Sequence, residues 1–372
     1  MLPILTIAIP THNRAHLLAQ CLGWLLPQVP GDGSVEVLVV DNGSSDATGA
    51  LLQNASRNDP RVCVARLPEN RGYAGSQMKC IETARGEYIA FLCDDDLYLP
   101  GQVERLLAFL PRGPYCLMAM NYISFRDDPT RPDPAEFAPD EDRIFARGLD
   151  LMNHPSDGHY SGLACRRDLA QRALAELMRE FDPAYYNRAR GIISEIAPRC
   201  AAGSNLPAAF MGARGVAART PHAINYDRLQ HLCHDYLVFQ YDLRRKGISS
   251  DQDFAYRAGL VESWLPMAIL HDAHLFDSGE LRAMRLAFDR MLGQCRGYRT
   301  RSRPLLRLGE QFAGLWLLSA LSLAIKAAQA HPASAACARR PGEGRQLMNI
   351  TMPDPKPREA PATVATFARL TR

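Results

Sequence analysis

Five short apolar runs alternate with helical segments over the first 120 residues, and this alternation constrains the fold more than any other feature of the chain. The apolar runs are residues 4–9, 35–40, 62–67, 88–93 and 115–120. Helices are expected between them, at residues 15–26, about 45–56, 74–84 and 102–110. Continuous apolar strands that alternate with helices are typical of a mostly parallel sheet covered by helices on both faces. The sequence therefore predicts an α/β fold.

Composition narrows the class of protein further. The chain has 372 residues, 47% of them hydrophobic, and a net charge of only +3, which argues against nucleic-acid binding through charge alone. The apolar start has no basic segment and is too short for a signal peptide or a membrane span. Its ten cysteines form no CxxC motif, so buried thiols in a reducing compartment are expected. A cytoplasmic protein is therefore predicted.

Polar residues follow three of the predicted strands directly. They are the segments Thr11-His12-Asn13-Arg14, Asp41-Asn42-Gly43-Ser44 and Asp94-Asp95-Asp96. In an open parallel sheet the ligand lies outside the carboxyl ends of the strands. These residues are therefore expected to line one binding site.

The three consecutive aspartates indicate a bound cation. Adjacent carboxylates repel one another, and beside the low-dielectric edge of a sheet they need a counter-charge. A hard divalent ion with oxygen ligands, Mg²⁺ or Mn²⁺, meets that need and keeps positions open for phosphate oxygens. The alternative is a solvated acidic turn, which the preceding apolar strand and the other strand-end residues disfavour.

Four segments of the chain resemble the family 2 glycosyltransferases of the GT-A fold. They are ILTIAIPTHNRAHLL, VEVLVVDNGSSDAT, NRGYAGSQMKCIETARGEYIAFLCDDDLYLP and the helix that follows, which together cover roughly residues 3–110. The resemblance implies a Rossmann-like, mostly parallel GT-A sheet with helices on both faces and a mainly helical C-terminal region. It also implies an inverting transfer of a sugar from a nucleotide-diphosphate donor.

The resemblance also implies roles for individual residues on the nucleotide side. Asp41 matches the acidic residue that contacts base or ribose, with a turn aspartate as the alternative, and Arg71 would pair with phosphate unless it is a surface arginine. The other positions that match the nucleotide-binding segments are Pro10, Thr11, Asn13, Arg14, Asn70, Gly72 and Gly75.

Asp94 to Asp96 match the DxD motif of the family. By that resemblance Asp94 would face the ribose and Asp96 would bind the metal ion, with Asp95 close to both the nucleotide and the metal. Some relatives use a late histidine near the diphosphate, which makes His222 a candidate ligand of metal or phosphate. A structural role is the alternative for a lone histidine.

The catalytic base is where the sequence departs from the family pattern. An inverting transfer needs a carboxylate that takes the proton of the acceptor hydroxyl. The family often supplies it from a Glu-Asp pair, but no such pair occurs at the expected distance after the aspartates. Glu195 is the candidate, Asp157 and Asp182 are the runners-up, and an exposed helix glutamate is the alternative interpretation of Glu195.

The sequence also predicts how the chain is divided into domains. Residues 1–225 are expected to form the catalytic domain, with a nucleotide-sugar half at 1–120 and an acceptor half at 121–225 in which 149–219 mixes helices and loops. Residues 226–330 are predicted to be helical, with helices at 226–246 and 254–274, and 331–372 to be a disordered tail. Within 305–330 a narrow polar stripe after an arginine cluster predicts either peripheral contact with an anionic membrane or packing on protein.

A metal-dependent glycosyltransferase of bacterial polysaccharide, lipopolysaccharide or glycoconjugate synthesis is therefore predicted. Its partners would be a nucleotide-diphosphate sugar, most commonly a UDP-sugar in this family, and a glycan, lipid-linked or small-molecule acceptor; a homo-oligomer is an open alternative. A catalytically silent scaffold of the same fold and a nucleotidyltransferase are the competing functions. The nucleotidyltransferase is disfavoured because residues 10–14 contain no glycine.

Overall fold

The computed structural model describes most of the first 292 residues and divides the chain into two compact units, Met1–Pro221 and His222–Arg372. The described residues are 2–126, 128, 130, 141–152, 159–180, 192–219, 233, 236–245, 247–272 and 278–292. Three predicted site residues, Asp157, Asp182 and His222, lie outside this part of the chain, as do the predicted membrane-contacting segment 305–330 and the predicted tail 331–372.

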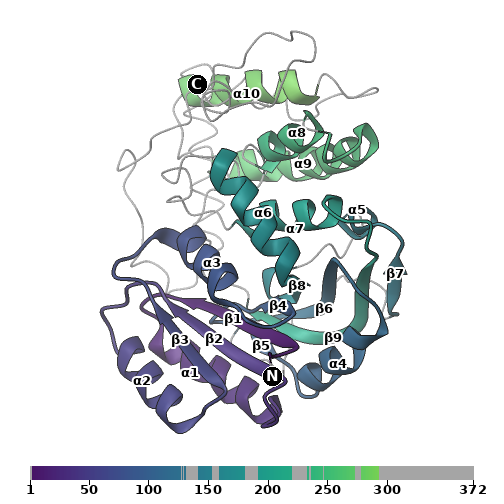
Figure 1. Cartoon of the computed structure of the whole chain (residues 1–372). Coiled ribbons are helices and arrows are strands. Elements are labelled where there is room, and N and C mark those ends of the chain that lie inside the picture. The colour runs from purple at the N-terminus through teal and green to yellow at the C-terminus, as the bar shows by residue number, and fades with distance from the viewer. Residues whose placement is uncertain are drawn as a thin grey trace. The chain divides into compact units, whose positions relative to one another are not determined.

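The described part of the first unit is built on one sheet (Figure 1). Its strands are β1 Leu5–Thr11, β2 Val35–Asp41, β3 Val62–Arg66, β4 Tyr88–Phe91, β5 Leu97–Tyr98, β6 Leu117–Phe125, β7 Arg143–Phe145, β8 Leu163–Arg166 and β9 Ala208–Arg219. The α-helices are α1 Ala15–Leu25, α2 Thr48–Asn58, α3 Gly72–Thr83, α4 Gln102–Phe109, α5 Gly148–Met152, α6 Arg167–Glu180 and α7 Ile193–Ala202. Short 3₁₀ turns lie at Leu26–Gln28, Leu110–Arg112 and Tyr160–Gly162.

The strands follow the order β3-β2-β1-β4-β8-β6-β9-β5, and β7 pairs with β9. The pairs β3–β2, β2–β1, β1–β4 and β6–β9 are parallel, whereas β8 is antiparallel to both of its neighbours. Helices α1 and α2 lie on one face of β1 to β3 and α3 lies on the other (Figure 1). Because helices cover both faces, every residue of β1 and β2 is buried. The predicted α/β fold is confirmed.

The second half of the sheet differs from the sequence analysis. The strand expected at residues 115–120 corresponds to β6, and β8, which was not predicted, lies between β4 and β6. The region 149–219, expected to mix helices and loops, also contains the strands β8 and β9, which were not predicted. The strand β9 has the sequence AAFMGARGVAAR. Alanine and glycine are depleted in strands, and the arginines interrupt the apolar run, so this sequence does not predict a strand.

The loop from β4 to β5 sets the curvature of the sheet. Residues 92–96 connect two strands that three other strands separate in the sheet order. A flat sheet would put these strands about 19 Å apart, at about 4.8 Å per spacing. A loop of this length reaches that far only when fully extended, at roughly 3.5 Å per residue, and residues 94 and 95 form a turn. The sheet therefore curls until β5 comes back near β4, as Figure 1 shows.

The described part of the second unit is helical, with α8 at Tyr236–Arg245, α9 at Asp251–Asp272 and α10 at Ser278–Leu292. The helix expected at 254–274 corresponds to α9, whereas only the second half of the helix expected at 226–246 falls on described residues, as α8. Within the described ranges, none of the helices has the length and apolar character needed to cross a membrane.

Candidate active site

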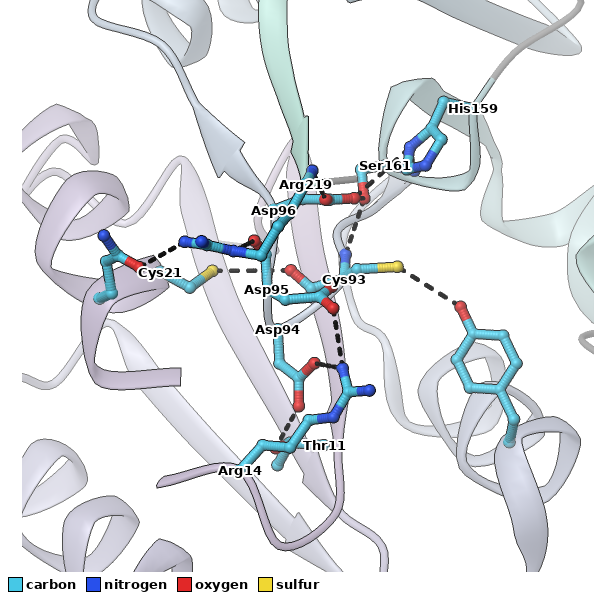
Figure 2. A network of polar contacts seen from close by, with 12 residues as sticks. Thr11, Arg14, Cys21, Cys93, Asp94, Asp95, Asp96, His159, Ser161 and Arg219 are labelled. Atoms are coloured by element: carbon cyan, nitrogen blue, oxygen red, sulfur yellow. Dashed lines mark hydrogen bonds and ion pairs between the residues drawn. The ribbon is translucent and has the colours of Figure 1, made fainter. Parts of the chain in front are cut away.

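The polar residues predicted to meet at one edge of the sheet do meet there. Strands β1, β2 and β4 are parallel neighbours, so the segments that follow them lie side by side. Their backbones are also joined, because Asn42 N donates a hydrogen bond to Thr11 O at 2.9 Å. Asp94 to Asp96, called the carboxylate loop below, follow β4 at this edge (Figure 2).

Asp94 faces the end of β1 and is only 4% exposed. Its Oδ2 accepts a hydrogen bond from Thr11 Oγ1 at 2.6 Å, and its Oδ1 accepts one from Arg14 Nη1 at 3.0 Å. Burial raises the pKa of Asp94 to about 6, although Arg14 and Thr11 act in the opposite direction by stabilising the carboxylate. The predicted neighbours Thr11, Arg14 and Asp94 are thus brought together in one network.

Asp96 faces the second half of the sheet and is 2% exposed. Its Oδ2 accepts a hydrogen bond from Ser161 Oγ and lies 3.4 Å from His159 Nδ1, while its Oδ1 accepts one from the backbone N–H of Arg219 at 2.7 Å. Burial raises the pKa of Asp96, and His159 opposes this effect. Ser161 also accepts a hydrogen bond from Cys93 N at 2.8 Å, so the 3₁₀ turn before β8 contacts Asp96 and the residue that precedes the carboxylate loop.

Asp95 is the most accessible of the three aspartates, with a side chain that is 25% exposed. Its Oδ2 accepts a hydrogen bond from Arg14 Nη1 at 2.9 Å. The ligand atoms of Cys93, Asp95 and Asp96 all lie within 4.8 Å of one another. Burial raises the pKa of the Cys93 thiol well above its usual range, and its Sγ lies 3.5 Å from Tyr73 Oη. The oxygen ligands of this cluster are therefore the carboxylates of Asp95 and Asp96.

Arg219 fixes the backbone of the carboxylate loop, a role that the sequence did not indicate. Its Nε donates a hydrogen bond to Asp95 O at 3.1 Å, and its Nη2 donates one to Gln20 Oε1 at 2.6 Å (Figure 2). The guanidinium also lies over the ring of Phe125, 4.6 Å from the ring centroid, and donates a hydrogen bond to Arg126 O. The end of β9 thereby holds the loop against α1 and the end of β6.

Asp41 ends β2 and is 1% exposed. Its Oδ1 accepts a hydrogen bond from Ser44 N at 2.9 Å, which is a turn interaction. Its Oδ2 lies 3.5 Å from Arg66 Nε and accepts no hydrogen bond within the described part of the chain. Asp41 Oδ2 is therefore a buried carboxylate oxygen with remaining capacity to accept hydrogen bonds.

The loops after β1, β2 and β3 are fastened to one another by asparagine side chains. Asn13, at φ 52°, accepts hydrogen bonds on its Oδ1 from Ser45 N and Asp46 N. Asn42 donates to Asn70 Oδ1 at 3.0 Å and to Gly72 O at 2.9 Å, and accepts from Arg71 N at 2.9 Å. The predicted positions Asn13, Asn70, Arg71 and Gly72 thus belong to one framework, while Pro10 is buried within β1 opposite Val40.

Glu195 lies in the first turn of α7 and is 2% exposed, so it is not an exposed helix residue. The start of α7 is joined to α3, because Ile192 N donates a hydrogen bond to Gln77 Oε1 at 2.6 Å. Glu195 is thus a buried carboxylate of α7.

The comparison with protein families matches residues 6–173 to the model described as glycosyl transferase family 2. Among curated proteins, the chain is 29% identical over 138 residues to the putative teichuronic acid biosynthesis glycosyltransferase TuaG of Bacillus subtilis, covering 37% of this chain and 54% of that protein. It is 38% identical over 106 residues to the succinoglycan biosynthesis protein ExoO of Rhizobium meliloti, covering 28% and 29%. The chain thus spans about half or less of the length of these relatives.

Solved structures match a larger share of the chain. The structure of Staphylococcus aureus TarS 1–349 in complex with UDP-GlcNAc aligns with a TM-score of 0.56 over 87% of this chain and 92% of that one, at 14% sequence identity. At that identity the likeness concerns the fold, which is GT-A-like. Residues 6–173 contain β1 to β4, the carboxylate loop and Ser161. Over these residues the chain is similar to glycosyl transferase family 2.

Proposed function

We propose that the chain is a glycosyltransferase that moves a sugar from a nucleotide-diphosphate donor to an acceptor hydroxyl with inversion of configuration. The observation that carries this proposal is the carboxylate loop, which lies beside Thr11 and Arg14 at the carboxyl edge of the sheet. In open α/β sheets this edge is where a nucleotide binds.

The donor site combines recognition of a nucleoside with binding of a diphosphate. The remaining hydrogen-bonding capacity of Asp41 Oδ2 suits a donor group of the base or ribose. The loop that carries Asn70, Arg71 and Gly72 is fixed by Asn42, which keeps it at the same edge. A UDP-sugar is the donor to test first, because the TarS structure of the same fold is a complex with UDP-GlcNAc.

The residues of the carboxylate loop fit a divalent cation. Asp95 and Asp96 offer oxygen ligands, as Mg²⁺ and Mn²⁺ prefer, and the accessible Asp95 leaves room for waters or phosphate oxygens. Such an ion would supply Lewis-acid stabilisation of the charge that develops on the departing diphosphate. Arg219 and Ser161 keep both carboxylates in position, and Thr11 holds Asp94 toward the nucleotide side.

The acceptor side needs a carboxylate that removes the proton of the attacking hydroxyl. Glu195 is our candidate, because α7 belongs to the acceptor half and its first turn is joined to α3 through Gln77. Asp157 and Asp182 are the alternatives to be tested beside it. The metal ligands lie on the leaving-group side, so the base acts from the opposite side of the reacting sugar.

The acceptor is proposed to be a bacterial glycan or a lipid-linked or small-molecule precursor of one. This choice follows the relatives, whose names assign them to teichuronic acid and succinoglycan biosynthesis. Synthesis of such precursors from nucleotide-sugars takes place in the cytoplasm, where we place the chain. Contact of residues 305–330 with the inner face of the membrane remains part of this proposal.

Calorimetry with UDP, GDP and dTDP, each with and without Mn²⁺, tests the donor site. The wild type is expected to bind one of them in a metal-dependent manner, and Asp95→Asn is expected to remove the metal dependence. The control is Asp59→Asn, which changes a carboxylate that pairs with Arg61 outside the site. Transfer or hydrolysis of the matching nucleotide-sugar then tests catalysis. Metal-dependent binding without any turnover would favour the silent scaffold, and no binding of any diphosphate would refute the donor site.

A further inference from the structure

Two arginines touch the carboxylate loop, and they are held in different ways. Arg219 is fixed by hydrogen bonds to Asp95 O, Gln20 and Arg126 O and by the ring of Phe125. Arg14 reaches the loop from the segment between β1 and α1, and its side chain is 45% exposed. Within the described residues its guanidinium contacts only Asp94 and Asp95 (Figure 2).

Both contacts of Arg14 use the same nitrogen. Its Nη1 lies 3.0 Å from Asp94 Oδ1 and 2.9 Å from Asp95 Oδ2, so one cationic group bridges two carboxylates. The charges of Asp94 and Asp95 raise the pKa of Arg14 despite the opposing effect of its partial burial. The Nε and Nη2 donors of Arg14 have no acceptor in the described part of the chain, so they are available to another anion.

We propose that Arg14 is the internal counter-cation of the metal site and exchanges its partner when a divalent ion binds. In the free protein it neutralises Asp94 and Asp95. When an ion binds at Asp95 and Asp96, Arg14 leaves Asp95, and its guanidinium becomes a ligand of the diphosphate that arrives with the ion. This inference rests on the proposed function and adds to it a competition between a side chain and the metal for one carboxylate.

The exchange follows from the charges. A guanidinium within about 5 Å of a divalent ion repels it, and the repulsion disfavours binding by roughly tenfold even at the dielectric constant of water. An ion that took Asp95 Oδ2 as a ligand would share this oxygen with Arg14 Nη1, which lies 2.9 Å from it. Arg14 is able to move because its side chain is 45% exposed and, among the residues that the structure describes, Asp94 and Asp95 are its only side-chain partners.

The test measures binding of Mn²⁺ alone, by calorimetry and by the electron paramagnetic resonance of the free ion. Arg14→Gln is expected to bind Mn²⁺ about tenfold more tightly than the wild type, because the competing charge is gone. Arg14→Lys keeps the charge and is expected to stay near the wild type. At saturating Mn²⁺, Arg14→Gln is expected to bind UDP more weakly, because a donor to the diphosphate is lost. A residue with a merely structural role would weaken both affinities when replaced.

Arg61→Gln is the matched control, since Arg61 also pairs with an aspartate, Asp59, but outside the site. It should change neither affinity. Unchanged or weaker Mn²⁺ binding by a folded Arg14→Gln variant, judged by its thermal unfolding, would overturn the inference. If that variant does not fold, wild-type protein with ¹⁵N-labelled arginine gives the answer, because the Arg14 signal must shift on addition of Mg²⁺.

The proposed function and this inference fail in different ways. If the wild type binds no Mn²⁺ and Asp95→Asn behaves identically, both are refuted. If Asp95→Asn abolishes Mn²⁺ binding but Arg14→Gln does not tighten it, the metal site stands and only the exchange of Arg14 is refuted.

Discussion

Ionisation of Asp94 is expected to destabilise the metal-free protein. Asp94 is 4% exposed, and burial raises its pKa from 3.8 to about 6. The folded state therefore holds the proton of Asp94 more tightly than the unfolded state does. This contribution to stability is fully present below about pH 3.8 and is lost as the pH rises through about 6. The sign is opposite to that of an aspartate whose salt bridge lowers its pKa.

The size of the effect follows from the two pKa values. The gap between 3.8 and about 6, at about 1.4 kcal/mol for each pKa unit, corresponds to about 3 kcal/mol of unfolding free energy. That is a substantial part of the stability of an ordinary domain. Asp94→Asn removes this titration, so the difference in unfolding free energy between wild type and variant isolates it from the other ionisable groups.

The assay is urea unfolding of both proteins in EDTA at a series of pH values between about 4 and 7. Of the total of about 3 kcal/mol, roughly 2 kcal/mol is expected to be lost within this range, as a fall in the stability of the wild type relative to Asp94→Asn. Asp59→Asn serves as the control, because Arg61 lowers the pKa of Asp59. The contribution of Asp59 to the unfolding free energy is therefore already complete above about pH 5. The reasoning would be refuted if the difference in unfolding free energy between the wild type and Asp94→Asn stayed constant or grew in favour of the wild type as the pH rises.

Three further substitutions test other parts of the molecule. Asp41→Asn is expected to weaken nucleotide binding by about 1–3 kcal/mol in calorimetry, the loss of hydrogen bonds to a charged group, and unchanged affinity would leave Asp41 a turn residue. Glu195→Gln is expected to lower kcat on the order of 10²-fold with the donor KM near normal, and normal turnover would exclude Glu195 as the base. Gly86→Ala is expected to lower the unfolding free energy by more than about 1 kcal/mol, because its Cβ would lie 2.4 Å from a backbone nitrogen of β1; an unchanged melting temperature would contradict that clash.

The first half of the sheet could be predicted because each strand there is a continuous apolar run between helices. Buried parallel strands leave that signal in the sequence itself. The strand β5 has only two residues, β8 only four, and β9 is rich in alanine and glycine. Such strands are defined by the neighbours with which they pair, so their positions depend on contacts between distant parts of the chain.

The same distinction applies to the candidate site. Thr11, Arg14 and Asp94 could be placed together because each follows a predicted parallel strand. Ser161 and Arg219 could not, since their contact with Asp96 requires β8 beside β4 and the end of β9 beside the carboxylate loop.

The short connection from β4 to β5 has a consequence for how the protein reaches its active form during synthesis. β5 pairs with β9, where Leu97 is the partner of Ala217, so this contact closes a loop of more than a hundred residues. Such long-range pairings form late in folding because the chain entropy of closing the loop opposes them. A nascent chain that has emerged only as far as β6 carries Thr11, Arg14 and all three aspartates, yet nothing anchors the second half of the carboxylate loop. β9 must therefore be synthesised before the three carboxylates acquire their final geometry, because Arg219 at its end contacts both Asp95 and Asp96.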